Sequence, residues 1–260
     1  MKPKIAVYVF PGTNSEDETK RALDDAGLDA QLVPSSETGA AARGFDGYVL
    51  PGGFAYEDRI RAGAVAAHDR AMDVVIEAAE RGKPVLGLCN GAQMLLEAGL
   101  VPGTGPMHRP TAAFAPNAHG GRFRSVHVHV KLAVVPSRSS LLANLPEGAV
   151  ISAWASHAEG RLAASLDELA RIERGGHLAF VYCNADGEVR ADAIPNGSAL
   201  GAAGLLNVEG NVLAIMPHPE RDAWAFMHRE SATRARTAAD ALKTAGGFAL
   251  FASFARAFVA

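Results

Sequence analysis

Short apolar runs alternate with amphipathic stretches along the first hundred residues. Residues 5–10 form a continuous apolar run, and shorter runs follow at 30–33, 48–50 and 85–86. These runs predict strands, and the unbroken first run predicts a strand buried on both faces of a sheet. Strands that alternate with helical stretches are typical of an α/β fold, with a mostly parallel sheet covered by helices on both sides.

Two helices are predicted between these strands. The first should end at Gly27, with Ser15 as its N-cap and Glu18 completing a capping box. The second should be a long amphipathic helix over residues 63–81, closed by Gly82. Because ligands bind at the carboxyl ends of strands in such folds, the residues that follow the strands are candidates for a functional site.

The middle of the chain has a different pattern. Over residues 123–131, Phe and Val alternate with basic residues, which predicts a half-exposed antiparallel strand. His127 and His129 would share one face of it. A metal site there would need a third ligand, and no further residue has a spacing that points to one. A solvated strand face is therefore the favoured interpretation, and no metal is expected.

The C-terminal part is predicted to be helical. Asp222 is a candidate N-cap for a helix that starts directly after it, residues 232–245 are rich in Ala, Arg and Lys, and residues 248–259 predict an apolar closing helix. We expect residues 1–260 to form a single domain, with residues 222–260 as a helical extension of that domain.

Composition restricts the class of protein further. The chain has 260 residues, of which 48% are hydrophobic and 20% charged, enough for a core that needs no disulfide or metal. The formal net charge of −3 provides no basic surface for nucleic acid. Cys89 and Cys183 form no disulfide framework, and Cys183 is expected in the core because it lies in the apolar run 178–183.

Compartment and cofactor can also be predicted from the sequence. The first apolar run is too short for a signal peptide, and no run approaches the ~20 residues of a membrane span. Together with a free thiol at Cys89, this predicts a cytoplasmic protein outside the membrane. Because no Gly-rich phosphate-binding motif occurs, we expect no nucleotide or other cofactor on this chain.

The most informative motif is Gly87-Leu88-Cys89-Asn90-Gly91. It lies between an apolar strand and a helical stretch and has the form of a nucleophile elbow, with Cys where α/β-hydrolases have Ser. The glycines permit a sharp turn that raises one side chain above the sheet. The thiol then faces a helix N-terminus, which favours a thiolate. A lone Cys is usually a small buried hydrophobe; the flanking glycines favour the catalytic interpretation.

A nucleophile needs a base and a group that orients the base. Met-Pro-His-Pro-Glu at residues 216–220 follows the apolar run 212–216, and its prolines disfavour a helix. In an extended segment His218 and Glu220 point the same way. A Cys89–His218–Glu220 triad would follow, in which the carboxylate holds the imidazole that moves the proton. Taken alone, the His-Pro-Glu sequence is more often a polar turn after a strand.

These motifs, with three further stretches, resemble the class I, triad-type glutamine amidotransferases. Within that class the chain resembles the glutaminase subunits of phosphoribosylformylglycinamidine synthase, over nearly its whole length up to residue 222. The matching stretches are 9–14, 51–56 with 58 and 61–63, 87–93, 156–160, and 195–198 with 216–221. The Asn that follows Cys89, the Gly-Gly-Phe segment and the Pro-Asn-Gly-Ser turn mark the subfamily.

The resemblance implies a flavodoxin-like sheet with additional antiparallel strands, and an enzyme that hydrolyses L-glutamine to glutamate and ammonia. The ammonia would pass to a large ATP-dependent synthetase subunit that makes formylglycinamidine ribonucleotide in purine biosynthesis. A small third subunit is also implied, and ATP and magnesium would be used by the synthetase.

Individual residues receive roles from the same resemblance. The catalytic residues would be Cys89, His218 and Glu220. The residues at the oxyanion and the substrate would be Gly52, Gly53, Asn90, Gln93, His157 and Glu159. In this set, backbone N–H groups of Asn90 and of one of the two glycines would bind the oxyanion, and His157 and Glu159 would lie near the glutamine or at the synthetase interface.

The chain departs from the family pattern in a few places. Glu57 stands where the family usually has Gly, residues 107–121 are hard to match, and the tail after residue 222 is longer. Arg61 and Arg221 are candidates for carboxylate binding or for structural ion pairs. Two alternatives stay open: an amidotransferase or cysteine hydrolase of another pathway, and a non-catalytic regulatory subunit with the same fold.

Overall fold

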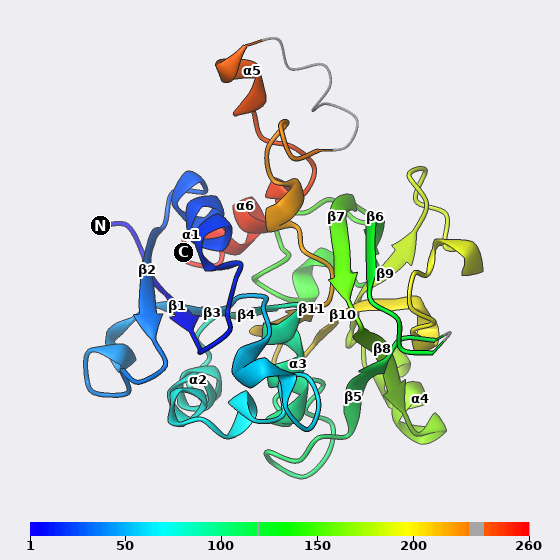
Figure 1. The fold of residues 1–260 in the computed structure, drawn as a ribbon, viewed down its shortest axis with the longest axis horizontal. Helices are drawn as coiled ribbons and strands as arrows, with labels where there is room; N and C mark the ends of the chain where they lie inside the picture. The colour runs from blue at the N-terminus through cyan, green and yellow to red at the C-terminus, as the bar shows by residue number, and fades with distance from the viewer. Residues whose placement is uncertain (119, 229–236, 260) are drawn as a thin grey trace.

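The computed structural model describes residues 1–118, 120–228 and 237–259, and its central sheet lies between two groups of helices (Figure 1). Five parallel strands form one half of this sheet, in the order β2-β1-β3-β4-β11. They are β1 (Lys4–Val9), β2 (Asp29–Pro34), β3 (Gly47–Leu50), β4 (Val85–Leu88) and β11 (Val212–Ile215). Each apolar run that predicted a strand in the first hundred residues overlaps one of them, and the first run extends one residue beyond β1.

Four antiparallel strands continue the same sheet beyond β11, in the order β10-β9-β6-β7. They are β10 (Ala202–Leu206), β9 (Leu178–Cys183), β6 (Arg124–Leu132) and β7 (Val150–His157). A separate antiparallel pair consists of β5 (Ala112–Pro116) and β8 (Glu159–Ala164). The predicted α/β class with additional antiparallel strands is confirmed, and the alternating run at 123–131 is β6.

Helices cover both faces of the parallel half. They are α1 (Glu16–Asp25), α2 (Arg70–Glu80), α3 (Asn90–Glu97) and α6 (Phe248–Arg256). Two further helices lie elsewhere in Figure 1: α4 (Leu166–Arg174) follows β8, and α5 (Ala238–Ala241) projects from the body of the molecule. Alternate residues of β1 enter two cores. Ile5 and Val7 pack in the core that includes α1 and α6, and Ala6 and Tyr8 pack in the core that includes α2 and α3. The predicted strand buried on both faces is therefore confirmed.

Short 3-10 helices occupy several of the connections. They are η1 (Ala42–Gly44), η2 (Ala55–Asp58), η3 (Ala66–His68), η4 (Pro136–Arg138), η5 (Ala191–Ala193), η6 (Ala199–Gly201) and η7 (Glu220–Asp222). Two of them lie at the segments that predicted the site: η2 follows the Gly52–Gly53 pair, and η7 begins at Glu220.

The helix predicted over 63–81 begins later than expected. Gly63 has a φ of +78°, a left-handed conformation that interrupts a helix. The Asp69 side chain accepts a hydrogen bond from the Ala71 N–H at 2.8 Å, so that α2 is capped at Asp69 and starts at Arg70. The Ala-rich stretch before it has helical composition but forms a turn and η3 instead.

The two predicted N-caps have different outcomes. Ser15 is the N-cap residue of α1, as predicted, but its side chain makes no capping hydrogen bond, and its Oγ lies 3.4 Å from the Arg221 guanidinium. Asp222 starts no helix, because a turn follows at 225–227 and its carboxylate faces two histidines.

The C-terminal prediction is confirmed in part. The closing helix is α6, and α5 lies within the stretch predicted at 232–245, of which residues 232–236 are outside the described residues. Within residues 1–118, 120–228 and 237–259, no helix has both the length and the apolar character that crossing a bilayer requires.

Candidate active site

The predicted elbow is a sharp turn between β4 and α3. Cys89 adopts φ 48° and ψ −104°, a conformation that is strained for a residue with a side chain. Its backbone N–H donates to the Ile215 carbonyl at 2.9 Å, which fixes the turn to the end of β11. A Cβ on Gly91 would lie 2.0 Å from the Leu50 carbonyl oxygen, so only glycine lets α3 start this close to β3.

The base reaches Cys89 because β11 lies beside β4 in the sheet. After β11 the chain pairs with β7: the His218 N–H donates to the Trp154 carbonyl at 2.8 Å, and the Trp154 N–H donates back at 3.2 Å. This pairing holds the segment extended. The His218 Nδ1 then contacts the Glu220 carboxylate by a short hydrogen bond. Both side chains are buried, so the predicted His-Glu orientation is present.

Charge distribution favours a protonated imidazole at this position. Burial alone would lower the pKa of His218, but the Glu220 carboxylate and the Cys89 sulfur, which is hydrogen-bonded to the imidazole, raise it to about 10. The imidazole thus interacts with the carboxylate and with the sulfur. A protonated imidazole beside a cysteine sulfur would stabilise the thiolate, which is the nucleophilic form of that side chain.

Asn90, the residue after the nucleophile, joins the elbow to the 51–58 loop. Its Oδ1 accepts from the Ala55 N–H at 3.0 Å, and its Nδ2 donates to Asp58 at 3.0 Å and to Gln93 at 2.9 Å. Gln93 donates from Nε2 to the Glu159 carbonyl. The predicted substrate residue Gln93 is therefore in the wall of the site, and its amide is bound to protein groups.

A small cavity opens at the sulfur. It has a volume of about 60 Å³ and is lined by residues that include Cys89, Gly53, Gln93, His157 and Glu159. Asn90 contacts this lining through Asp58 and Gln93. Ligand clefts usually exceed about 300 Å³, so the free space at the sulfur is small for a ligand site.

Gly52 and Gly53 adjoin different groups of the site. A Cβ on Gly52 would lie 2.4 Å from Cε1 of His218 and 2.8 Å from the Ser15 Oγ. Gly53 has a φ of +156°, and a Cβ there would lie 2.6 Å from the Thr13 backbone. Gly52 therefore makes room for the imidazole, whereas Gly53 faces the cavity beside Cys89.

His157 is a neutral residue in the wall of the cavity. Burial, followed by the positive charge on His218, lowers its pKa to about 3. Its Nδ1 lies 3.2 Å from the Oδ1 of Asn117, which also accepts from the Gly160 N–H. The Nε2 of His157 is buried, and no hydrogen-bond partner is present among the described residues.

Two supporting residues were missed by the sequence analysis. Asn117 holds His157 in place, yet it lies in the stretch 107–121 that was hard to match. Asp58 lines the cavity; burial, with the nearby Glu159 charge adding to it, raises its pKa to about 6 although Asn90 donates a hydrogen bond to it. Asp58 was part of a matching stretch, so its position in that motif was the available signal.

The arginines form structural ion pairs. Arg61 pairs with the Glu97 carboxylate through two nitrogens, and Arg221 lies 3.7 Å from Glu18 and contacts Ser15. Glu57, which stands where the family usually has Gly, has a φ of 60°. The departure from the family pattern thus falls at a position whose conformation favours glycine.

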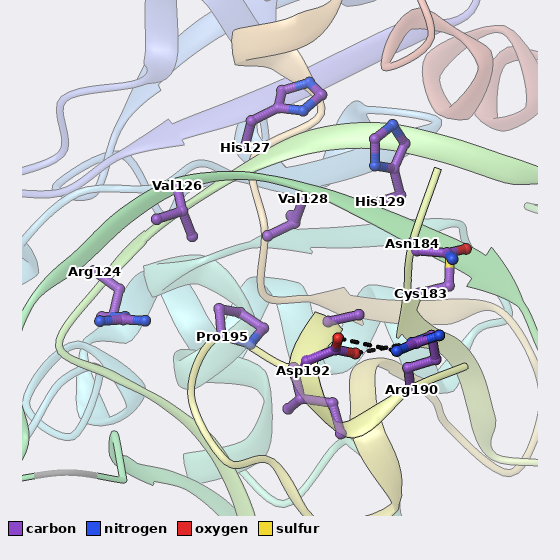
Figure 2. A pocket seen from close by; sticks show the side chains of 12 residues that line it. Arg124, Val126, His127, Val128, His129, Cys183, Asn184, Arg190, Asp192 and Pro195 are labelled. Carbon is purple, nitrogen blue, oxygen red and sulfur yellow. Dashed lines mark hydrogen bonds and ion pairs between the residues drawn. The ribbon is translucent and has the colours of Figure 1, made fainter. Parts of the chain in front are cut away.

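A larger cavity lies on the antiparallel half of the sheet, away from the elbow. It has a volume of about 490 Å³ and lies between β6, the end of β9 and the 190–195 segment (Figure 2). None of its lining residues is a predicted site residue. Cys183 is among the residues that line this cavity. Burial raises the pKa of its thiol to about 11, so the thiol stays protonated. The side chain is buried, as predicted.

Comparison with known proteins defines the class of protein. The family model of the CobB/CobQ-like glutamine amidotransferase domain matches residues 2–256. With the elbow and the triad described above, this shows that the chain belongs to the class I glutamine amidotransferases.

The relatives identify the family within that class. A phosphoribosylformylglycinamidine synthase subunit PurQ from Pyrococcus furiosus is 41% identical over 227 residues, which are 87% of this chain and 92% of the relative. The corresponding subunit from Symbiobacterium thermophilum is 42% identical over 84% of this chain and 87% of its own length. The chain belongs to this PurQ family.

A solved structure agrees over the whole fold. The structure of PurLQS from Thermotoga maritima contains a chain that is 28% identical, with a TM-score of 0.74 and coverage of 98% of both chains. The predicted family, fold and enzyme class are confirmed by these comparisons.

Proposed function

We propose that this chain hydrolyses L-glutamine through Cys89, His218 and Glu220 and supplies the ammonia for phosphoribosylformylglycinamidine synthase. The observation that carries the proposal is the position of these side chains. They come from the carboxyl ends of two adjacent parallel strands, β4 and β11, and the imidazole interacts with both the sulfur and the carboxylate.

The reaction begins with attack of the Cys89 thiolate on the side-chain amide carbon of glutamine. Negative charge then develops on the amide oxygen, and donors fixed in advance stabilise it. The backbone N–H of Asn90, at the N-terminus of α3, and that of Gly53, in the cavity wall, are the donors we assign. The imidazolium of His218 gives its proton to the leaving nitrogen, so that ammonia departs and a thioester remains.

Hydrolysis of the thioester completes the cycle. His218, now neutral, takes a proton from water as the water attacks the thioester carbon, and the Cys89 thiolate leaves as glutamate is released. Glu220 keeps the imidazole oriented in both steps. The protons balance, because the imidazole gives one to ammonia and recovers one from water.

The acidic side chains in the cavity suit the other end of the substrate. Asp58 and Glu159 lie on the side of the cavity formed by the 51–58 loop and β8. Their carboxylates match the α-ammonium group of glutamine in charge. We therefore assign them to binding the amino-acid end, and Gln93 and His157 to shaping the wall between the two ends.

The synthetase is a separate subunit in this proposal. The Thermotoga maritima protein that this chain resembles belongs to a complex named PurLQS. We extend that arrangement to this chain, with a large ATP-dependent synthetase subunit and a small third subunit. Because ammonia released to water is lost, hydrolysis should be coupled to the synthetase, and we expect weak glutaminase activity from the isolated chain and stronger activity in the complex. Equal turnover in both would contradict the coupling.

Replacement of the nucleophile tests the chemistry. In the reconstituted complex, Cys89→Ser should abolish synthesis with glutamine and leave synthesis with added ammonia intact. Cys183→Ala is the matched control, because that thiol is buried in β9 and outside the site, and it should keep both activities. Full glutamine-dependent activity in Cys89→Ser would contradict the mechanism.

Covalent labelling separates the enzyme from a non-catalytic subunit of the same fold. A glutamine-like electrophile should modify Cys89 and leave Cys183 unmodified, as mass spectrometry of peptides would show. A related assay with other amides tests the alternative of a different cysteine hydrolase. Glutamine should be turned over far faster than any of them.

A further inference from the structure

A cluster of three side chains outside the active site has the composition of a metal centre. His127 comes from β6, Asp222 from the end of η7, and His228 from just after the turn at 225–227. The His127 Nε2 lies 3.4 Å from the Asp222 Oδ2, and the His228 Nδ1 lies 2.9 Å from the same oxygen. The three ligand atoms all lie within 4.8 Å of one another.

The burial of the cluster contradicts the solvated strand face that was favoured for His127. Its side chain is only 5% exposed, that of Asp222 is fully buried, and that of His228 is 19% exposed. Figure 2 shows the rings of His127 and His129 on the same side of β6, pointing away from the Arg190–Asp192 pair. The sequence could not show this cluster, because the two partners of His127 come from a segment about a hundred residues away and His129 is not one of them.

Hydrogen bonds between the three side chains leave part of the cluster unsatisfied. The second carboxylate oxygen of Asp222, Oδ1, is buried and has no hydrogen-bond partner in the described part of the chain. The Oγ of Ser152, on β7 directly opposite His129, lies close enough to the Asp222 carboxylate to help lower its pKa, but neither Ser152 Oγ nor Asp222 Oδ1 completes a hydrogen bond within the described residues. A buried carboxylate oxygen without a partner is costly, and a bound cation with its water would remove that cost.

The ligand types and spacing select the kind of cation. Two imidazole nitrogens and one carboxylate oxygen suit zinc and related divalent transition metals better than calcium or magnesium. Bonds of about 2.0–2.2 Å in tetrahedral geometry place ligand atoms roughly 3.4 Å apart. The separation between His127 and Asp222, 3.4 Å, already equals this value, and the separation between His228 and Asp222, 2.9 Å, would lengthen by about 0.5 Å when the metal replaces the hydrogen bond. Three protein ligands leave a fourth position for water.

We propose that His127, Asp222 and His228 bind a zinc-type divalent cation that fastens the segment after the catalytic residues to the antiparallel half of the sheet. Asp222 lies two residues after Glu220 in η7. The His127 ring packs against the Trp154 ring at 5.3 Å between centroids, and the Trp154 backbone pairs with His218. The cation therefore supports the frame of the catalytic base without touching the substrate.

The test measures metal binding by the full chain. Protein stripped with a chelator is titrated with Zn²⁺ against a chromophoric competitor, and the bound metal is counted by mass spectrometry. We expect one Zn²⁺ per chain. Loss of second-sphere partners weakens metal sites 10–100-fold, so removal of a ligand in His228→Ala should weaken binding by more than about 100-fold. The visible spectrum with Co²⁺ should indicate a four-coordinate site and should be lost in His228→Ala.

Two controls exclude other binding groups. His108→Ala removes a partly exposed histidine that pairs with Glu80 elsewhere on the surface, and Cys89→Ser removes the catalytic thiol. Both should bind Zn²⁺ as the unaltered chain does. Asp222→Asn keeps the size of the buried side chain and should also weaken binding.

Two results of the Zn²⁺ titration would overturn the proposal. Absence of saturable Zn²⁺ binding would mean that the cluster is held by hydrogen bonds alone, and it would overturn the proposal. Binding that is unchanged in His228→Ala would overturn it as well. If Asp222→Asn does not fold, thermal unfolding decides: added Zn²⁺ should raise the unfolding midpoint of the unaltered chain and leave that of His228→Ala unchanged.

Discussion

Gly52→Ala is expected to displace the catalytic base with a single methyl group. The added Cβ would lie 2.4 Å from Cε1 of His218, whereas ordinary contacts begin near 3.4 Å. The ring must therefore move by about 1 Å. His218 is only 1% exposed, and its Nδ1 is bound to Glu220, so the displacement changes its position relative to the sulfur. A misplacement of about 1 Å costs on the order of 10²-fold in rate.

The assay compares glutamine hydrolysis by Gly52→Ala with that of the unaltered chain, both in the synthetase complex. We expect kcat to fall about 100-fold, whereas synthesis with added ammonia should persist. Overpacking of this kind costs typically 1–3 kcal/mol of stability, so urea unfolding must show that the variant is folded under assay conditions.

Gly44→Ala provides the matched control. A Cβ there meets no atom within 4 Å, and the residue does not have a left-handed φ. Its activity and stability should remain close to those of the unaltered chain. The reasoning would be refuted if folded Gly52→Ala kept kcat within about threefold of the unaltered value, because the imidazole would then not be held where the structure places it.

Three further predictions concern residues around the site. Because the pKa of Asp58 is raised to about 6, its carboxylate becomes charged as the pH rises through that value; the KM for glutamine should fall over this range, and Asp58→Asn should remove this dependence in steady-state assays. An unchanged pH profile in that variant would contradict the assigned role. Glu57→Gly should raise the free energy of unfolding by about 0.5–1 kcal/mol, because Glu57 has a φ of 60° and an exposed side chain; urea unfolding measures this, and a loss of stability would count against it. Glu220→Gln keeps the buried volume but releases the imidazole tautomer, so kcat should fall by up to about 10⁴-fold with little change in KM. A loss below tenfold would show that the carboxylate is dispensable.

The parallel half of the fold could be predicted because its signals are local. Each buried strand is a short apolar run that ends at Gly, Pro or a polar residue, and the elbow and the His-Pro-Glu segment follow directly after two of them. Such strands and motifs can be predicted from residues that are neighbours in the sequence. Their meeting at one edge of the sheet then follows from the parallel arrangement of the strands.

The errors arose where distant residues decide the local structure. Ser15 has the sequence of an N-cap, but its hydroxyl lies against Arg221. Asp222 likewise looks like a cap, but its carboxylate is bound by His127 and His228. In both cases a tertiary contact replaced the local hydrogen bond that the residue type favours.

Contacts between residues distant in the sequence also limit what can be predicted about the site. The catalytic residues are identified by motifs, whereas Asn117 acts through a hydrogen bond to His157, which lies forty residues further along the chain. Nothing in the sequence around Asn117 indicates that contact. Its role becomes visible only when the end of β5 is placed beside the end of β7.

The contacts of Asn90 imply that the entry of glutamine and the positioning of the oxyanion-binding N–H group are coupled. Its side chain bridges Ala55 and Asp58, while its main chain directly follows the sulfur-bearing residue. A glutamine molecule that pushes this loop outward also strains the peptide unit intended for the developing negative charge. Substitutions along the loop should consequently alter turnover as well as affinity, even at positions that never meet the ligand.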